Sequence, residues 1–305
     1  MNTYKISIEV LSPLETPLKG DTIWGHIAWG IANHQGDEAV AEFIEDCKNP
    51  DKAFVVSSAF PKGTICKNIE PPPERKDDFD AEDYAKIKQC KKQKFQSAAY
   101  FVNEVPTSKS DKESEEKLKN PFAQNISTHN SINRWTNTVQ EGALYATSEM
   151  WSRQKDFDIY LVSSYSEKRI EELFEWAFEN GYGADSSVGK GKISVAKNSL
   201  HKVTFKKNGS GIKKYVALSP FVLTTVDSDE LKAMDLRADI FVRSGKIGGA
   251  FVSSHIPWKK TVVMYDEGAT FISDKEISFI GNLITDVHQD PKICQAGFAP
   301  VIPIE

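Results

Sequence analysis

The glycine-rich segment 181–192 is the part of the sequence whose residue types best suit a charged ligand. It reads GYGADSSVGKGK, and it follows a helical pattern and precedes a strand pattern. Glycine permits positive φ and close approach of the backbone to a ligand, and successive backbone N–H groups in such a loop form a concavity suited to phosphate. We therefore predict a phosphate-binding loop that uses Gly181, Gly183, Ser186, Ser187, Gly189, Lys190, Gly191 and Lys192, with the amides of Gly183, Gly189 and Gly191 assisting the two lysines.

A basic tract begins in this loop, although the chain as a whole carries a net charge of -5. Between Ser186 and Val226 there is no Asp or Glu, while eight lysines fall inside the same stretch. A local positive stripe on an acidic protein indicates a polyanionic partner at one place on the surface. The alternative is a surface turn rich in Gly and Ser, with solvated lysines beside it.

Several common ligand sites are excluded by spacing. Five residues separate Gly183 from Gly189, and Gly191 follows Lys190, so the loop is neither a Walker A motif nor a Gly-x-Gly-x-x-Gly motif. The four cysteines are scattered and the histidines lack metal-ligand spacing, so we expect no metal site, no disulfide framework and no cofactor. The composition fits a reduced, cytoplasmic protein, and no apolar run reaches the ~20 residues that cross a membrane.

The elements that must position the loop have an alternating order. Tyr4–Val10 and Phe157–Val162 have strand patterns, and residues 22–34 and 166–180 have apolar faces at helical spacing. Asp21 has the residue type and position of an N-cap for the first helix. The order β-α-…-β-α-β predicts an α+β fold with an antiparallel ferredoxin-like (RRM-type) unit rather than a Rossmann sheet. We place the N-terminal domain at 1–205 and a strand-rich C-terminal domain at 206–305.

A protruding hairpin is predicted within the N-terminal domain, as part of an insertion over about 71–150. Residues 129–134 (HNSINR) lead to an apolar and aromatic run over 144–151. His129, Asn130 and Arg134 have suitable chemistry for RNA, since Arg forks onto phosphate and Asn reads base edges. A structural polar loop fits these residues equally well. The role of the charge-rich stretch 71–119 stays open.

His26, between Trp24 and Ile27 on the first helix, has two interpretations. It is either a packed residue or a general acid/base, and catalysis needs a partner group and a scissile phosphate within reach.

Three segments together resemble a known family. They are the stretch 12–27, with SPL and KGDTIWGHI, the hairpin segment 129–134, and the glycine loop 181–191. The C-terminal motifs at 248–251 (GGAF), 257–260 (PWKK) and 265–268 (YDEG) add to the likeness. The chain resembles the RAMP superfamily of CRISPR proteins, most closely the type III-A (Csm) effector subunit that caps the 5′ handle of the guide RNA.

The resemblance implies two ferredoxin-like domains and a hairpin thumb that folds over the guide. It implies a non-catalytic subunit that binds the 5′ handle of the crRNA, with Gly248 and Gly249 as further RNA contacts. The implied protein partners are the large polymerase-like subunit and a backbone RAMP subunit, and target RNA is met only indirectly. The alternative within the superfamily is a guide-precursor-processing endoribonuclease that uses His26. A free-standing interaction protein is the more distant alternative.

Overall fold

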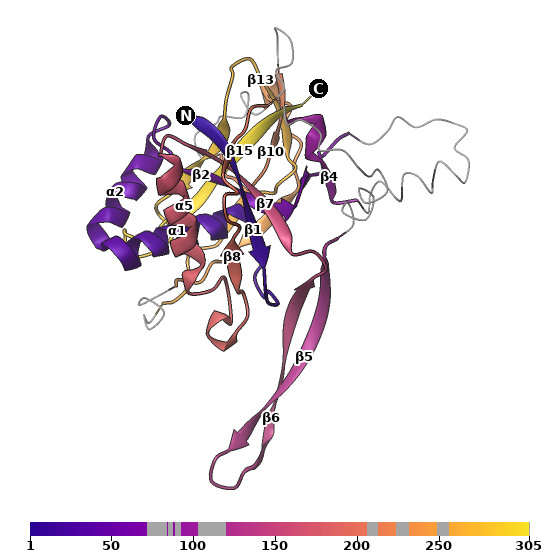
Figure 1. Cartoon of the computed structure of the whole chain (residues 1–305), viewed down its shortest axis with the longest axis vertical. Helices are drawn as coiled ribbons and strands as arrows, with labels where there is room; N and C mark the ends of the chain where they lie inside the picture. The colour runs from indigo at the N-terminus through magenta and orange to yellow at the C-terminus, as the bar shows by residue number, and fades with distance from the viewer. Residues whose placement is uncertain are drawn as a thin grey trace.

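The computed structural model describes residues 1–71, 84, 88, 93–102, 120–205, 213–223, 232–248 and 256–304. Its first layer is a five-stranded antiparallel sheet in the order β2-β7-β1-β8, with β9 also paired to β1. Helices α1 and α5 pack together against it (Figure 1). The elements are β1 (Asn2–Val10), α1 (Gly20–Gln35), α2 (Asp37–Lys48), β2 (Val55–Pro61), β7 (Asp156–Ser163), α5 (Glu167–Glu179), β8 (Ile193–Val195) and β9 (His201–Lys202).

The connectivity of this layer is β-α-β-β-α-β. Helix α1 lies between β1 and β2 in sequence, α5 lies between β7 and β8, and the two central strands β1 and β7 are neighbours. This is the arrangement of a split β-α-β unit, and the α+β class predicted from the sequence is confirmed. Alternate residues of β1, from Tyr4 to Val10, are buried beneath the helices.

A second antiparallel sheet has the order β13-β10-β15-β14, beside a separate pair, β11 and β12. Within its described residues no complete helix lies between these strands, so a second ferredoxin-like unit stays a prediction. These strands are β10 (Lys213–Ala217), β11 (Ile240–Arg243), β12 (Val262–Tyr265), β13 (Thr270–Ser273), β14 (Phe279–Ile284) and β15 (Gln295–Ile304).

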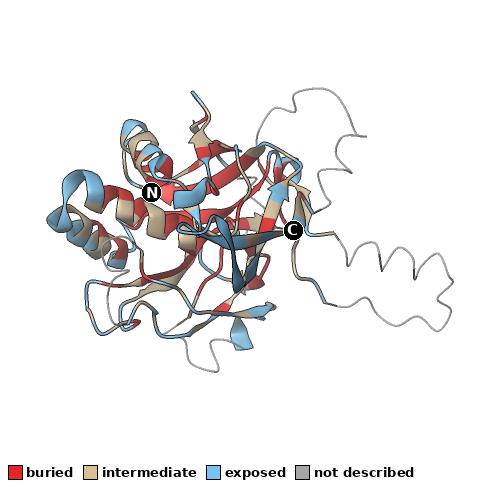
Figure 2. Cartoon of the chain, turned by 90° about the horizontal axis from the view of Figure 1, so that it is seen from below, coloured by how far each residue is buried: buried red, intermediate tan, exposed pale blue. Residues whose placement is uncertain are grey.

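The two sheets share their cores. Phe298 of β15 meets Trp24 of α1 edge to face, with ring centroids 5.8 Å apart, in the same cluster as Ile6 of β1. A second cluster joins Tyr160 of β7 to Ile302 of β15. The buried residues therefore run through the middle of the molecule while the outer helix faces are exposed (Figure 2). The division near residue 205 stays a prediction, and residues 206–212 lie outside the described part.

The predicted hairpin is confirmed as β5 (Phe122–Asn133) and β6 (Thr138–Ser152), which pair antiparallel over most of their length. It projects from the body as a long two-stranded arm, which we call the thumb (Figure 1). At its base, a backbone bridge between Leu14 and Met150 joins it to the segment after β1. Most of the predicted insertion before it, 71–119, lies outside the described residues. A short pair, β3 (Thr64–Cys66) and β4 (Phe95–Ser97), is followed by the turn η1 (Ala98–Tyr100).

Helix α1 is confirmed, but the prediction that Asp21 caps it is wrong. The helix begins at Gly20 after Lys19, without a side-chain cap. The Asp21 carboxylate instead accepts hydrogen bonds from Arg243 Nη2 at 2.6 Å and Gln295 Nε2 at 2.9 Å. Two distant partners, one of them charged, hold the side chain that a local pattern assigns to the helix terminus. None of the described helices is long and apolar enough to cross a membrane.

Candidate nucleic-acid interface

The glycine loop lies between α5 and β8, as predicted, and contains the short turn η2 (Ser186–Val188). All four of its glycines have positive φ. A Cβ added to Gly191 would lie 1.9 Å from the carbonyl oxygen of Tyr182, and one added to Gly183 would lie 2.5 Å from Thr16. The glycines therefore allow the loop to fold tightly onto itself and onto the segment after β1.

The amides predicted to assist phosphate binding are used inside the protein. Gly183 N–H donates to His26 Nε2 at 3.1 Å, Gly189 N–H to the carbonyl of Ser186, and Gly191 N–H to the carbonyl of Pro13 at 2.8 Å. That part of the prediction is wrong, because these three donors close the loop. In the described part of the chain the amides of 185–187 form no hydrogen bond, so they are the loop's available backbone donors.

Lys190 is buried within a cluster of carboxylates. Its Nζ lies 2.8 Å from Glu15, 3.1 Å from Asp185 and 3.7 Å from Glu149, and it donates to Thr147 Oγ1 at 3.3 Å. Desolvation disfavours the charged ammonium group, but the hydrogen bonds that it donates to Glu15 and Asp185 raise the pKa of Lys190 above its usual value. The cation thus ties the glycine loop to β6 at the thumb base, and its charge is already neutralised by protein groups.

We expect Lys190→Met to loosen the thumb base. Three carboxylates lose their shared cation, and leaving such groups unpaired costs about 1–3 kcal/mol. Amide exchange at Met150, whose N–H donates to the carbonyl of Leu14 at 2.7 Å, should become faster. Lys192→Met is the matched control because Lys192 is exposed. Equal exchange at Met150 in both variants would contradict the anchoring role.

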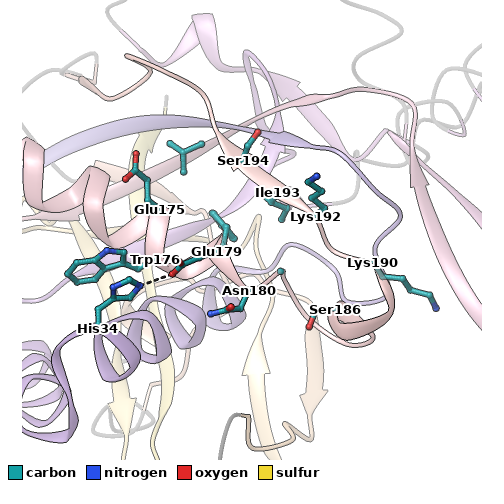
Figure 3. A pocket seen from close by; sticks show the side chains of 14 residues that line it. His34, Glu175, Trp176, Glu179, Asn180, Ser186, Lys190, Lys192, Ile193 and Ser194 are labelled. Carbon is teal, nitrogen blue, oxygen red and sulfur yellow. Dashed lines mark hydrogen bonds and ion pairs between the residues drawn. The ribbon is translucent and has the colours of Figure 1, made fainter.

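Lys192 is oriented differently from Lys190 (Figure 3). It lines a shallow groove of about 750 Å³ between the C-terminal half of α5, the loop and β8. The far end of the groove holds His34, which stacks on Trp176 with centroids 4.5 Å apart and forms a hydrogen bond with Glu179 at 2.7 Å. Among the described residues that line the groove, Lys192 is the cation without an ion-pair partner. It lies at the loop end, where Ser186 contributes a hydroxyl group.

His26 positions the loop. Its Nε2 accepts the Gly183 amide, and its ring packs on Tyr182 with centroids 4.8 Å apart. Burial lowers the pKa of His26 to about 4, against a smaller opposing effect of the Ala177 carbonyl. Since Nε2 is an acceptor, the neutral ring carries its proton on Nδ1.

The neutral state of His26 predicts a pH dependence of stability. The unfolded histidine titrates near 6.5, so between pH 6.5 and 4 the unfolded chain binds the proton more readily than the folded chain. Neutral His26 therefore stabilises the folded state fully above pH 6.5. This stabilisation, about 3 kcal/mol, is lost as the pH falls toward 4. Urea unfolding should show this slope in the wild type. In His26→Gln, whose amide can make both contacts without titrating, the slope should flatten, and an unchanged slope would contradict the assignment.

The thumb residues lie on different faces of the hairpin. His129 stacks on Tyr145, with centroids 5.3 Å apart, and bonds Thr147 Oγ1 at 3.0 Å, so it lies on the face toward Lys190. Asn130 pairs with Leu144 on the opposite face. Arg134 is exposed in the tip turn, far along the thumb from the loop. The structure thus brings His129 to the loop and leaves the other two apart from it.

The thumb carries little charge but many exposed apolar side chains. The pairing places Ile126, Ile132, Val139 and Leu144 on the face opposite His129, and each is more than half exposed. Trp135 at the tip is 97% exposed. Such a surface suits bases or an apolar partner better than phosphates.

The second glycine patch is separate from the loop. Gly248 lies against α1, where an added Cβ would be 3.0 Å from Trp29 Nε1, and Gly249 lies outside the described residues. Three further features of the site have no signal in the sequence: Glu15, Glu149 and the Asp21–Arg243 pair. No local pattern could reveal them, because their partners lie more than 40 residues away in the sequence.

Comparison with known proteins decides the family. The RAMP superfamily model matches residues 15–194, which include α1, the thumb and the whole glycine loop. The chain belongs to the RAMP superfamily. A search of curated protein sequences gave no match.

Solved structures share the fold over the whole chain. One is a chain of the crystal structure of a Csm1-Csm4 cassette in complex with AMPPNP, with TM-score 0.57, 16% identity, and coverage of 99% of this chain and 98% of the other. Another belongs to a Csm3-Csm4 subcomplex of the type III-A CRISPR-Cas interference complex, with TM-score 0.54, 16% identity and full coverage of both chains. Csm4 is the component common to both complexes.

Proposed function

We propose that this RAMP protein is a non-catalytic RNA-binding subunit of a type III CRISPR effector complex. It holds the 5′ handle of the crRNA and lies between the large subunit and a backbone RAMP subunit. The main support is the end-to-end fold likeness to chains from Csm1-Csm4 and Csm3-Csm4 complexes. Those complexes contain the kinds of partner that the proposal names.

The loop geometry supports a positioning role toward RNA. Ser186, whose amide is free, and the exposed Lys192 both line the groove, and the free amides of 185 and 187 adjoin Ser186 in the loop. Backbone amides and lysines bind phosphates without reading sequence. Lys190, which we predicted as a phosphate ligand, contributes indirectly in this proposal, since it fixes the loop against the thumb.

The processing-endoribonuclease alternative has less support. A general acid/base needs a free ring nitrogen and a pKa near the working pH. His26 has its Nε2 occupied by the Gly183 amide and a pKa of about 4. We therefore favour a structural His26 in a subunit without its own cleavage activity.

The test is incubation of the purified chain with end-labelled repeat RNA from its own locus, followed on native and denaturing gels. The proposal expects a shifted but intact RNA, or an RNA retained only when the other subunits are co-expressed. Specific cleavage that disappears in His26→Ala would overturn the proposal and favour the endoribonuclease.

A further inference from the structure

Five basic side chains lie exposed between the thumb base and β9, and we call them the basic rim. In the described part of the chain none of the five forms an ion pair. Some exposed lysines elsewhere are paired: Lys48 with Glu45, Lys52 with Asp46 at 3.0 Å, and Lys168 with Glu172 at 3.9 Å. Others, such as Lys94 and Lys275, also form no ion pair among the described residues, so the rim differs from them in the clustering of its members. The rim consists of Arg153, Lys155, Lys192, Lys197 and Lys202.

Strand pairing gathers the rim at one end and one edge of the first sheet. The N–H of Val10 donates to the carbonyl of Lys155 at 2.9 Å, and the N–H of Leu11 donates to the carbonyl of Lys192 at 2.8 Å. The two lysines therefore flank the end of β1, two strand spacings or about 10 Å apart. Arg153 adjoins them at the thumb base, where its N–H donates to the carbonyl of Pro121.

The remaining rim lysines follow β1 away from the loop. Val10 pairs with Ile193 of β8, and Tyr4 pairs with Lys202 of β9. Six residues of β1 separate these points, which is about 20 Å at the rise of a strand. Lys197 lies between β8 and β9 in sequence. The acidic residue of β1 in this stretch is Glu9, opposite Ser194, and Glu175 and Glu179 of α5 line the groove beside Lys192. The edge segment 186–202 itself contains lysines and no Asp or Glu.

We propose that the basic rim binds the phosphates of single-stranded RNA over about 20 Å beyond the glycine loop. This inference rests on the proposed RNA-binding function and adds the path that the strand takes. Lysines without carboxylate partners, spaced along an edge, suit a linear polyanion. An acidic protein partner is less well matched, because protein interfaces are depleted in lysine and rely on aromatic anchors.

Two triple variants of the full chain separate the rim from other exposed lysines. The rim variant is Lys192→Gln, Lys197→Gln and Lys202→Gln. The control removes the same charge at paired positions, as Lys48→Gln, Lys52→Gln and Lys168→Gln. The probe is a fluorescein-labelled oligouridylate of about 20 nucleotides, and its Kd is measured by anisotropy from about 50 to 200 mM salt.

The rim variant should bind the RNA at least tenfold more weakly at the lowest salt. The magnitude of its slope of log K against log salt should decrease by about 2, which is ~0.7 for each lost phosphate contact. The control should keep the wild-type slope. A wild-type slope in the rim variant would contradict phosphate binding by the rim but would leave the proposed RNA-binding function in place. A wild-type chain that binds no RNA, alone or in the co-expressed complex, would contradict the proposed function itself. Equal competition by poly-glutamate at matched charge would reassign the rim to an acidic polypeptide.

Discussion

Gly191→Ala should destabilise the folded chain by about 2–5 kcal/mol and abolish binding at the glycine loop. Gly191 has a φ of +69°, where an L-residue costs roughly 1–2 kcal/mol. Its added Cβ would also lie 1.9 Å from the carbonyl oxygen of Tyr182, and relieving such overpacking costs about 1–3 kcal/mol. The backbone must move, and with it the hydrogen bond from Tyr182 N–H to the Gly191 carbonyl.

Gly189→Ala is the matched control. Gly189 has a φ of +96°, but an added Cβ would meet no atom within 4 Å. The Gly189→Ala substitution should therefore lower the free energy of unfolding only by the cost of a positive φ for alanine, about 1–2 kcal/mol. Urea unfolding of both variants gives the comparison, with oligouridylate binding measured on the folded fraction. Equal losses of stability would show that the tight contact at Gly191 is not what holds the loop.

Asp21→Ala should destabilise the chain by about 3–5 kcal/mol, because it leaves a partly buried cation without its partner. The Asp21 side chain is 2% exposed and bonds Arg243 of β11 and Gln295 of β15. Among the described residues Arg243 Nε has no hydrogen-bond partner, so the guanidinium depends on this carboxylate. Through these two bonds the carboxylate ties β11 and β15 to the start of α1, the helix that carries His26.

The double variant Asp21→Ala with Arg243→Met separates a lost attraction from an unpaired charge. Removing both groups should recover part of the loss of stability, since no partly buried cation is then left without its carboxylate. The measurement is the urea midpoint at constant m-value for the four members of the cycle. Additive losses would mean that the two side chains do not act as a pair.

The sequence predicted those elements whose signals are local. The alternation over Tyr4–Val10 and the apolar face over 22–34 lie close to the observed β1 and α1. The hairpin was predicted from the polar stretch 129–134 and the apolar and aromatic run 144–151, which lie in β5 with its turn and in β6. The glycine loop was also predicted, because positive φ and tight backbone contacts require glycines, and a cluster of glycines is visible in the sequence.

The chemistry of the loop could not be predicted in the same way. Lys190 and Lys192 are two residues apart and have the same residue type, yet one is enclosed by Glu15, Asp185 and Glu149 and the other is exposed. The difference depends on where the thumb base lies relative to the loop. Asp21 gives the same lesson, since its distant partner Arg243 outweighs the local capping pattern.

The central claim is that this RAMP protein holds the guide handle within an effector complex. The most direct measurement is the 5′ end of the RNA that purifies with the complex, after nuclease treatment, with and without this chain among the co-expressed subunits. The account predicts a protected common handle that is lost when the chain is omitted and shortened in the rim variant. A handle protected to the same nucleotide without the chain would contradict it.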